Sequence, residues 1–175
     1  MVNRGIKIED IHHYLNTTDN DILDPLLLDN LRPAAQMLLA HIKNMDKTCI
    51  LIDCDLDGYS SSSALINYLY KLFPTFVKNS IKYQTNEGKK HGIILDTIPQ
   101  DIKLLIVPDA GSNDIEQCQK LKEKGIDVLI LDHHICQDVN PYACIVNNQM
   151  CNYPTKSLCG AGVVYKFCQY IDNLL

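Results

Sequence analysis

Three short stretches of the sequence gather side chains that can bind metal ions or transfer protons. They are Asp53-Cys54-Asp55-Leu56-Asp57-Gly58, Asp109-Ala110-Gly111 and Asp132-His133-His134. Each stretch comes at the end of a short apolar run that has the length of a buried strand. Because parallel sheets bind ligands beyond the carboxyl ends of their strands, we expect the three stretches to converge in space.

Converging carboxylates need a compensating charge. Four or five aspartates brought together would repel one another, raise one another's pKa values and destabilise the fold. Hard divalent cations remove this repulsion by taking the carboxylate oxygens as ligands. The added histidine shifts the preference from calcium or magnesium alone toward a transition metal such as manganese. Two such ions about 4 Å apart are the arrangement used in phosphodiester hydrolysis, so the residues alone predict a phosphoesterase.

Each stretch taken singly also has a simpler interpretation. The run from Asp53 to Gly58 could be an acidic turn that caps a helix. An EF-hand loop is excluded, because Ala64 stands where that loop requires a glutamate. Asp109 could end its strand in an ordinary turn, and His133 and His134 could be a surface pair. The joint placement of the three stretches at neighbouring strand ends favours the metal site.

Small and hydroxylated residues follow the first acidic stretch. Gly58 and the serines from Ser60 to Ser63 open a predicted helix with free amides and hydroxyls, which suits a bound phosphate. Simple N-capping by one serine is the alternative, and the two are compatible. We predict Gly58, Ser60 and Ser61 as phosphate or nucleic-acid contacts.

The elements that position these residues follow from the apolar pattern. Buried strands are expected at 48–52, 103–107, 127–131 and 143–146, with a further strand at 76–83. Helices are expected at 60–73, 114–124 and 160–174. Strands that alternate with helices predict an α/β fold whose parallel, Rossmann-like sheet has helices on both faces. Residues 1–46 are predicted to be a short helical segment packed on the core, with helices near 8–15 and 33–43.

Composition bounds the class of protein. A chain of 175 residues, 46% of them hydrophobic, is expected to form one main domain with a buried core. No apolar stretch reaches the roughly 18 residues of a membrane span, and the N-terminus lacks the apolar core of a signal peptide, so we expect a cytoplasmic protein without membrane contact. The net charge of −5 argues against a generic DNA-coating protein but not against a nuclease that concentrates carboxylates at one point.

Eight cysteines are spaced singly, without a C-x-x-C pair. In a chain of this size without an export signal we expect reduced thiols, with Cys49 and Cys159 in apolar surroundings. A zinc site formed by Cys144, Cys151 and Cys159 is an alternative, although its spacing matches no compact structural-zinc pattern.

Taken together, the motifs resemble those of the DHH phosphoesterase superfamily, whose name-giving motif stands here as Asp132-His133-His134. The D-x-D-x-D-G form of the first motif is similar to the RecJ-like branch, the single-stranded-DNA-specific exonucleases. Other branches carry a histidine at the position of Leu51. Two further stretches resemble RecJ segments, namely Ile22 to Asp29 and Val146 to Phe167. The resemblance covers nearly the whole chain and implies its N-terminal DHH domain.

The resemblance implies two Mn²⁺ or Mg²⁺ ions and a ligand set for them. Asp53 and Asp55 would hold one ion. Asp57 and His133 would hold the other, and Asp109 would bridge both.

It also implies roles around the ions. Asp132 would orient His133, and His134 would contact the scissile phosphate, so that Asp109, Asp132 and His134 are the predicted catalytic residues. Gly160 and Gly162, in the glycine-rich helix start, join the predicted phosphate contacts.

The implied function is metal-dependent hydrolysis of single-stranded DNA by a 5′ to 3′ exonuclease of RecJ type, in DNA repair and recombination. Two alternatives stay open: a DHH phosphodiesterase acting on short oligoribonucleotides or cyclic dinucleotides, and a non-catalytic RecJ-like scaffold subunit. A further metal-binding aspartate and a DHH-associated domain are expected beyond Leu175. Residues 47–175 would then be a DHH catalytic domain truncated at its C-terminal end, completed by that domain or by a protein partner.

Two surface features complete the pattern. In the loop from Tyr83 to Ile93, Asn86 and His91 stand where the family carries an arginine and a tyrosine-glycine pair. The only local basic stretch could contact a nucleic-acid backbone or be solvated surface; it consists of Lys78, Lys82, Lys89 and Lys90.

Overall fold

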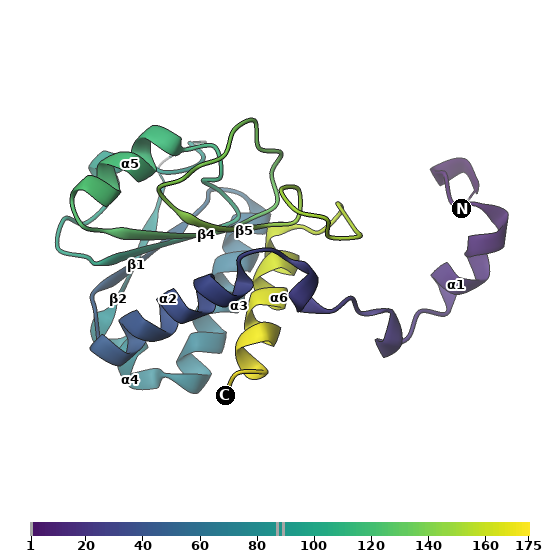
Figure 1. The fold of residues 1–175 in the computed structure, drawn as a ribbon, viewed down its shortest axis with the longest axis horizontal. Coiled ribbons are helices and arrows are strands. Elements are labelled where there is room, and N and C mark those ends of the chain that lie inside the picture. Colours follow the sequence, from purple (N-terminus) through teal and green to yellow (C-terminus); the bar gives the residue numbers. More distant parts are fainter. Residues whose placement is uncertain (1, 87, 89) are drawn as a thin grey trace.

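The fold is built on a five-stranded parallel sheet, seen nearly edge-on in the computed structural model, which describes residues 2–86, 88 and 90–175 (Figure 1). The strand order is β2-β1-β3-β4-β5, and every neighbouring pair is parallel. The strands are β1 (Thr48–Ile52), β2 (Ile81–Thr85), β3 (Leu104–Pro108), β4 (Asp127–Asp132) and β5 (Cys144–Asn147). The predicted α/β fold with a parallel sheet is confirmed.

Helices cover both faces of the sheet, as predicted. One face carries α2 (Leu31–Asn44), α3 (Leu56–Leu72), α4 (Pro74–Ser80) and α6 (Gly160–Asp172), and the other carries α5 (Ile115–Glu123) (Figure 1). The short helix α1 (Ile11–Leu15) lies apart from the sheet (Figure 1). Single 3-10 turns complete the elements: Val2–Arg4, Ile8–Asp10, Asp19–Asp21, Pro25–Leu27 and Leu95–Thr97.

Alternation along the strands divides the core in two. Ile50 and Ile106 pack with the apolar residues of α2, α3 and α6. Leu51 and Leu105 point to the opposite face and pack with Cys118 of α5. Because both faces are covered, the strands are continuously apolar, and this made them recognisable in the sequence.

The strand predicted at 76–83 is wrong for its first half, because residues 74–80 form helix α4 and the strand begins only at Ile81. Pro74 stands at the first helical position, where its fixed φ and missing N–H are tolerated. Phe76, Val77 and Ser80 are buried, and this spacing places them on one side of a helix. The apolar run is short enough to suit either element.

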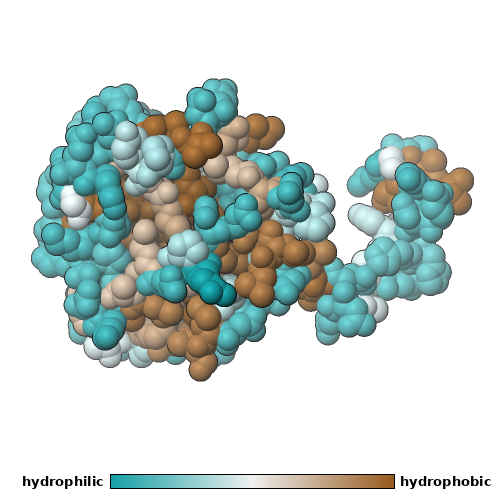
Figure 2. All heavy atoms as spheres, in the orientation of Figure 1, coloured by the Kyte–Doolittle hydropathy of each residue, from teal (hydrophilic) through white to brown (hydrophobic). Residues whose placement is uncertain are grey.

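The N-terminal segment 1–46 packs on the core only in its second part. Leu28, Leu31 and Leu38 are buried, whereas no described side chain between Val2 and Asp21 is buried. This N-terminal arm stands clear of the body and carries exposed hydrophobic side chains (Figures 1 and 2). Its helical pieces are too short to be stable by themselves and have no apolar face long enough to bury.

The arm leaves the body at a defined point. The ammonium of Lys166, buried in α6, donates a hydrogen bond to the carbonyl of Leu23. In the described residues, no helix combines the length and the apolar character that a membrane crossing requires.

Candidate metal centre

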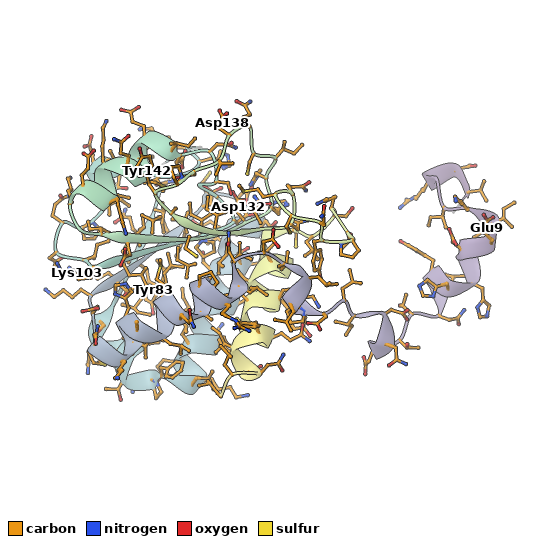
Figure 3. The ribbon with its side chains drawn as sticks, viewed as in Figure 1. Glu9, Tyr83, Lys103, Asp132, Asp138 and Tyr142 are labelled. Atoms are coloured by element: carbon orange, nitrogen blue, oxygen red, sulfur yellow. The ribbon has the colours of Figure 1, made fainter. Side chains whose placement is uncertain are left out.

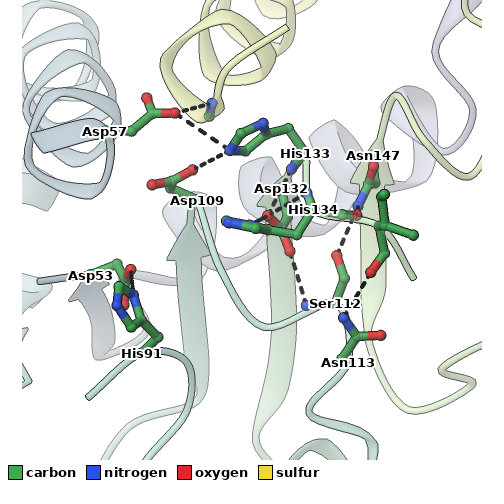
Figure 4. Close-up of polar contacts among 12 residues, drawn as sticks. Asp53, Asp57, His91, Asp109, Ser112, Asn113, Asp132, His133, His134 and Asn147 are labelled. Carbon is green, nitrogen blue, oxygen red and sulfur yellow. Dashed lines mark hydrogen bonds and ion pairs between the residues drawn. The ribbon is translucent and has the colours of Figure 1, made fainter. Parts of the chain in front are cut away.

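The acidic stretches meet at the carboxyl edge of the sheet, at the point where the strand order changes direction. In the order β2-β1-β3-β4-β5, that change lies between β1 and β3, which is where open sheets of this kind form a crevice. Asp53 follows β1, Asp109 follows β3 and His133 follows β4, and Figure 4 shows all three facing this crevice. The structure therefore brings the three predicted stretches together.

The first acidic stretch both caps a helix and faces the crevice. Helix α3 begins at Leu56, four residues earlier than predicted from the serines, and Asp55 is its N-cap. The carboxylate of Asp55 accepts a hydrogen bond from the amide of Gly58 at 2.9 Å. Gly58 lies so close to Asp53 that an added Cβ would stand 2.6 Å from the Asp53 Cβ. The capping interpretation is thus correct for Asp55, and it leaves Asp53 and Asp57 on either side of the helix start.

Asp57 is held by the N-terminus of α6, more than a hundred residues further along the chain. The amides of Gly160 and Ala161 donate hydrogen bonds to its carboxylate at 2.7 and 3.0 Å. Burial raises the pKa of Asp57, but these amides and the nearby His133 outweigh it, so the pKa lies below its usual value. The Asp57 carboxylate is therefore charged and fixed in direction.

Asp109 is a buried carboxylate without hydrogen-bond donors. Its side chain is 1% exposed, and neither carboxylate oxygen accepts a hydrogen bond from the described residues. His133 Nε2 lies 3.1 Å from Oδ1, as an ion-pair contact. Burial, together with the charges of Asp57 and Asp55, raises the pKa of Asp109 to about 8. A carboxyl group in this situation needs a cation, so the donor set fits divalent metal ions.

The ligand atoms fall into two groups that share Asp109. Oxygens of Asp53, Asp55 and Asp109 lie within 4.8 Å of one another, and so do ligand atoms of Asp109, His133 and His134. The first group contains Asp53 and Asp55, and the second contains His133 with His134, where Asp57 was expected. Asp57 stands slightly back, with Oδ2 3.5 Å from His133 Nε2.

Asp132 orients a different histidine from the one we expected. Its Oδ1 accepts hydrogen bonds from the backbone of His133 at 2.7 Å and from the ring Nδ1 of His134 at 2.7 Å (Figure 4). Its Oδ2 accepts the amide of Ser112 at 3.1 Å. Asp132 thus holds the His134 ring, and it positions His133 only through the main chain. Burial raises the pKa of Asp132, but these donors outweigh it and hold the pKa below the ordinary value.

Replacing Asp132 with asparagine is expected to lower the free energy of unfolding by roughly 2–3 kcal/mol at pH 7, because a neutral amide cannot satisfy all these donors. Since the pKa of Asp132 is depressed on folding, its contribution is present above the unfolded pKa and is lost as the pH falls through the folded value. Urea unfolding at pH 7 and at acidic pH measures both effects.

The matched control is Asp138→Asn, because Asp138 is exposed in the loop that follows and points away from Asp132 (Figure 3). Equal stability of the two variants at pH 7 would contradict this role for Asp132.

The predicted phosphate contacts have mostly other partners. The amide of Gly58 donates to Asp55 and that of Gly160 to Asp57. Ser61 is buried with its hydroxyl 3.4 Å from an Asp57 oxygen.

The remaining two contribute within their own helices. The exposed Ser60 donates to the Leu56 carbonyl at 2.8 Å. Gly162 lies in the first turn of α6. Three of these five residues, Gly58, Ser61 and Gly160, therefore contact aspartates, and their bonded groups are not free donors for a phosphate.

A cavity of about 670 Å³ opens beside the centre. Its lining includes residues from all three stretches, and also His91 and Ser112, which are among the lining residues that the sequence analysis did not assign to the site. Ser112 follows the Asp109 motif directly and could have been found from that position. His91 lies in a loop without a periodic pattern, so only its departure from the family loop marked it.

The remaining predictions concern cysteines and lysines. All eight cysteines are free thiols; Cys49 is buried, but Cys159 is exposed rather than in apolar surroundings. Cys144, Cys151 and Cys159 form no ligand group among the described residues. Lys82 forms an ion pair with Asp101, and Lys89 lies outside the described residues.

Comparison with known proteins places the fold and the motifs in one family. Residues 47–174 match the model of the DHH family, N-terminal domain. The chain is 44% identical over its full length to YorK, a candidate single-strand DNA-specific exonuclease of the SPbeta prophage in Bacillus subtilis. It is 31% identical over 95% of its length to the single-stranded-DNA-specific exonuclease RecJ of the same organism. It spans 30% and 22% of these two relatives.

Solved structures show the same fold. An exonuclease RecJ bound to manganese superposes with a TM-score of 0.74 at 21% identity, over 87% of this chain and 40% of the other. RecJ of Thermus thermophilus in complex with Mn²⁺ gives a TM-score of 0.67 at 20% identity, over 88% and 22% of the two chains. With its family match over residues 47–174 and the DHH motif at the end of β4, the chain belongs to the DHH family and contains that family's N-terminal domain.

Proposed function

We propose that this chain is the catalytic DHH domain of a metal-dependent exonuclease that hydrolyses phosphodiester bonds in single-stranded DNA. The observation that supports this most directly is Asp109, a buried carboxylate without hydrogen-bond donors among the described residues that two ligand groups share. A scaffold would gain nothing from such a residue, because an uncompensated buried carboxylate destabilises the fold.

The chain's own residues would divide the work as follows. Asp53 and Asp55 would hold one cation, Asp57 and His133 the other, and Asp109 both. Two Mn²⁺ or Mg²⁺ ions would supply the charge that polarises the phosphate and lowers the pKa of water. Mixed oxygen and nitrogen ligands favour Mn²⁺.

His134 would meet the phosphate. Burial lowers the pKa of His134, but the hydrogen bond and charge of Asp132 outweigh it and raise the pKa above its ordinary value. Because Nδ1 is bonded to Asp132, Nε2 is the ring atom left to donate a hydrogen bond to a phosphate oxygen. The half-exposed ring lines the cavity, where a strand end could enter.

The substrate class is inferred from the relatives named for single-strand DNA. We extend it to 5′ to 3′ polarity, release of 5′-phosphorylated nucleotides and a role in DNA repair and recombination. We further propose that a DHH-associated domain or a protein partner contributes to binding of the strand.

The test is release of nucleotides from single-stranded DNA labelled at the 5′ or the 3′ end, with Mn²⁺, Mg²⁺ or chelator. Both this chain and the natural full-length protein are assayed. We expect Mn²⁺-dependent release of 5′ label. His133→Ala is expected to lower the rate roughly tenfold or more, because it removes a nitrogen ligand.

His12→Ala, in the exposed arm, is the control and should leave the rate unchanged. If the protein hydrolysed di- and trinucleotide RNA or a cyclic dinucleotide but left single-stranded DNA uncut, the proposed substrate would be wrong. Absence of metal-dependent hydrolysis of every substrate by the full-length protein would overturn the activity.

A further inference from the structure

A second set of possible ligands lies on the outer side of Asp53. His91 Nδ1 is 2.6 Å from Asp53 Oδ2, and the Sγ of Cys54 is 3.7 and 3.6 Å from the two ring nitrogens of His91. One carboxylate oxygen, one sulfur and one imidazole nitrogen thus lie within 4.8 Å of one another. Figure 4 shows His91 against Asp53, away from the His133 side of the crevice.

The loop that carries His91 is fixed from both sides. The amide of Gly92 donates to Asp53 at 3.3 Å, and its carbonyl accepts from the buried Asn86 at 2.8 Å. The next amide, of Ile93, donates to Asp114 at 2.7 Å. Gly92 has a φ of +76°, and an added Cβ would stand 2.4 Å from an Asp114 oxygen. The main chain beside His91 is therefore held in place, although the ring itself reaches solvent.

From this arrangement we infer that Asp53, Cys54 and His91 form a binding site for a thiophilic divalent cation, Zn²⁺ in the cell. Sulfur and imidazole ligands select zinc over manganese and magnesium, and zinc also binds such sites more tightly in the general affinity order.

The ligand atoms are close enough to bind one ion after the His91 ring turns. Because tetrahedral zinc bonds sulfur at about 2.3 Å and nitrogen at about 2.0 Å, these two ligands lie roughly 3.5 Å apart around it. Cys54 Sγ lies 3.7 and 3.6 Å from the two ring nitrogens of His91, so the exposed ring must turn to direct one nitrogen at the ion. Three protein ligands leave one position for water, as in zinc sites that stay open.

The site would compete with the centre described above, because Asp53 belongs to both ligand groups. Zinc at Cys54 and His91 would draw the Asp53 carboxylate away from the cation that Asp53 and Asp55 hold, so that micromolar zinc would inhibit the nuclease. The competition rests on the proposed function, whereas the binding of zinc does not.

Binding is tested with Co²⁺ as a spectroscopic substitute for Zn²⁺ on the metal-free protein. We expect a near-ultraviolet thiolate-to-cobalt charge-transfer band that saturates at one equivalent and is abolished by Zn²⁺. Cys54→Ser should lack the band, and His91→Gln should weaken Co²⁺ binding by roughly tenfold or more. Cys144→Ser, at a thiol that is also partly buried but outside the group, should keep the band.

Absence of the band in the unchanged protein, or its persistence in Cys54→Ser, would overturn the site. The competition has its own readouts. Mn²⁺ binding followed by electron paramagnetic resonance should be unchanged in Cys54→Ser without zinc, and zinc should displace Mn²⁺ at a lower concentration from the unchanged protein than from Cys54→Ser. Equal displacement from both proteins would overturn the competition, whether or not either one cleaves DNA.

Discussion

Asparagine at position 109 is expected to abolish DNA cleavage while making the metal-free protein more stable. Asp109 is shared by both ligand groups, so its loss should lower the rate by about 10⁴-fold, the scale seen when a central catalytic group is removed. The same carboxylate is buried near Asp57 and Asp55. An amide of the same shape removes that repulsion.

The stability effect has a defined pH dependence. The pKa of Asp109 is about 8 in the folded state and about 3.9 in the unfolded chain. The unfolded carboxyl therefore loses its proton first, and the metal-free protein loses stability as the pH rises from about 4 to about 8. Asp109→Asn does not lose stability in this way. The difference in free energy of unfolding between the metal-free variant and the metal-free unchanged protein should therefore grow to a few kcal/mol between about pH 4 and about pH 8.

Thermal unfolding at pH 5 and at pH 8, with chelator and with Mn²⁺, measures the effect. Mn²⁺ should raise the melting temperature of the unchanged protein, because a ligand that binds only the folded state stabilises it, and should leave Asp109→Asn unaffected. Asp10→Asn, in the exposed arm, is the control. A metal-free Asp109→Asn variant less stable than the unchanged protein at pH 8 would contradict the electrostatic account.

Adding one methyl group at position 160, by Gly160→Ala, is expected to have the second large effect on activity. An added Cβ at Gly160 would stand 2.2 Å from Asp109 Oδ1 and 2.6 Å from its Cγ. Either α6 or the Asp109 carboxylate must move, and α6 also donates the amides that hold Asp57. We expect Gly160→Ala to lower the rate about 100-fold, the scale of a 1 Å misplacement, and the stability by about 1–3 kcal/mol.

Gly162→Ala is the matched control on the same helical turn. Its added Cβ would meet the end of the Leu158 side chain at 3.2 Å, and that side chain can yield. Rates, Mn²⁺ affinity and urea unfolding of the two variants are compared. Equal activity in Gly160→Ala and Gly162→Ala would show that the close approach to Asp109 has no functional weight.

The strand ends could be predicted because a strand that is buried on both faces consists of an uninterrupted run of apolar residues. Leu51, Leu105 and Ile130 belong to continuous apolar runs, and the acidic motifs begin where those runs stop. The positions of Asp53, Asp109 and Asp132 at one sheet edge follow from this alone.

What could not be predicted depends on contacts between distant segments. The amides of Gly58 and Gly160 looked free in the sequence, and only the fold shows that aspartates accept from them. The His134 ring forms its hydrogen bond with Asp132 within a local turn, and no periodic pattern in the sequence predicts that bond. His91 contacts Asp53 from a loop without regular structure, so no pattern in the neighbouring sequence predicted this contact.

The hold of α6 on Asp57 also sets the order in which this protein can mature. Asp57 and Gly160 are separated by 103 positions along the chain, and contacts of that sequence separation form late because a long loop must close first. During synthesis the acidic stretch after β1 leaves the ribosome several seconds before Gly160, at about 5–20 residues per second. In the nascent chain, Asp57 therefore lacks the two amide donors of α6 until that helix has been synthesised and has packed against α3.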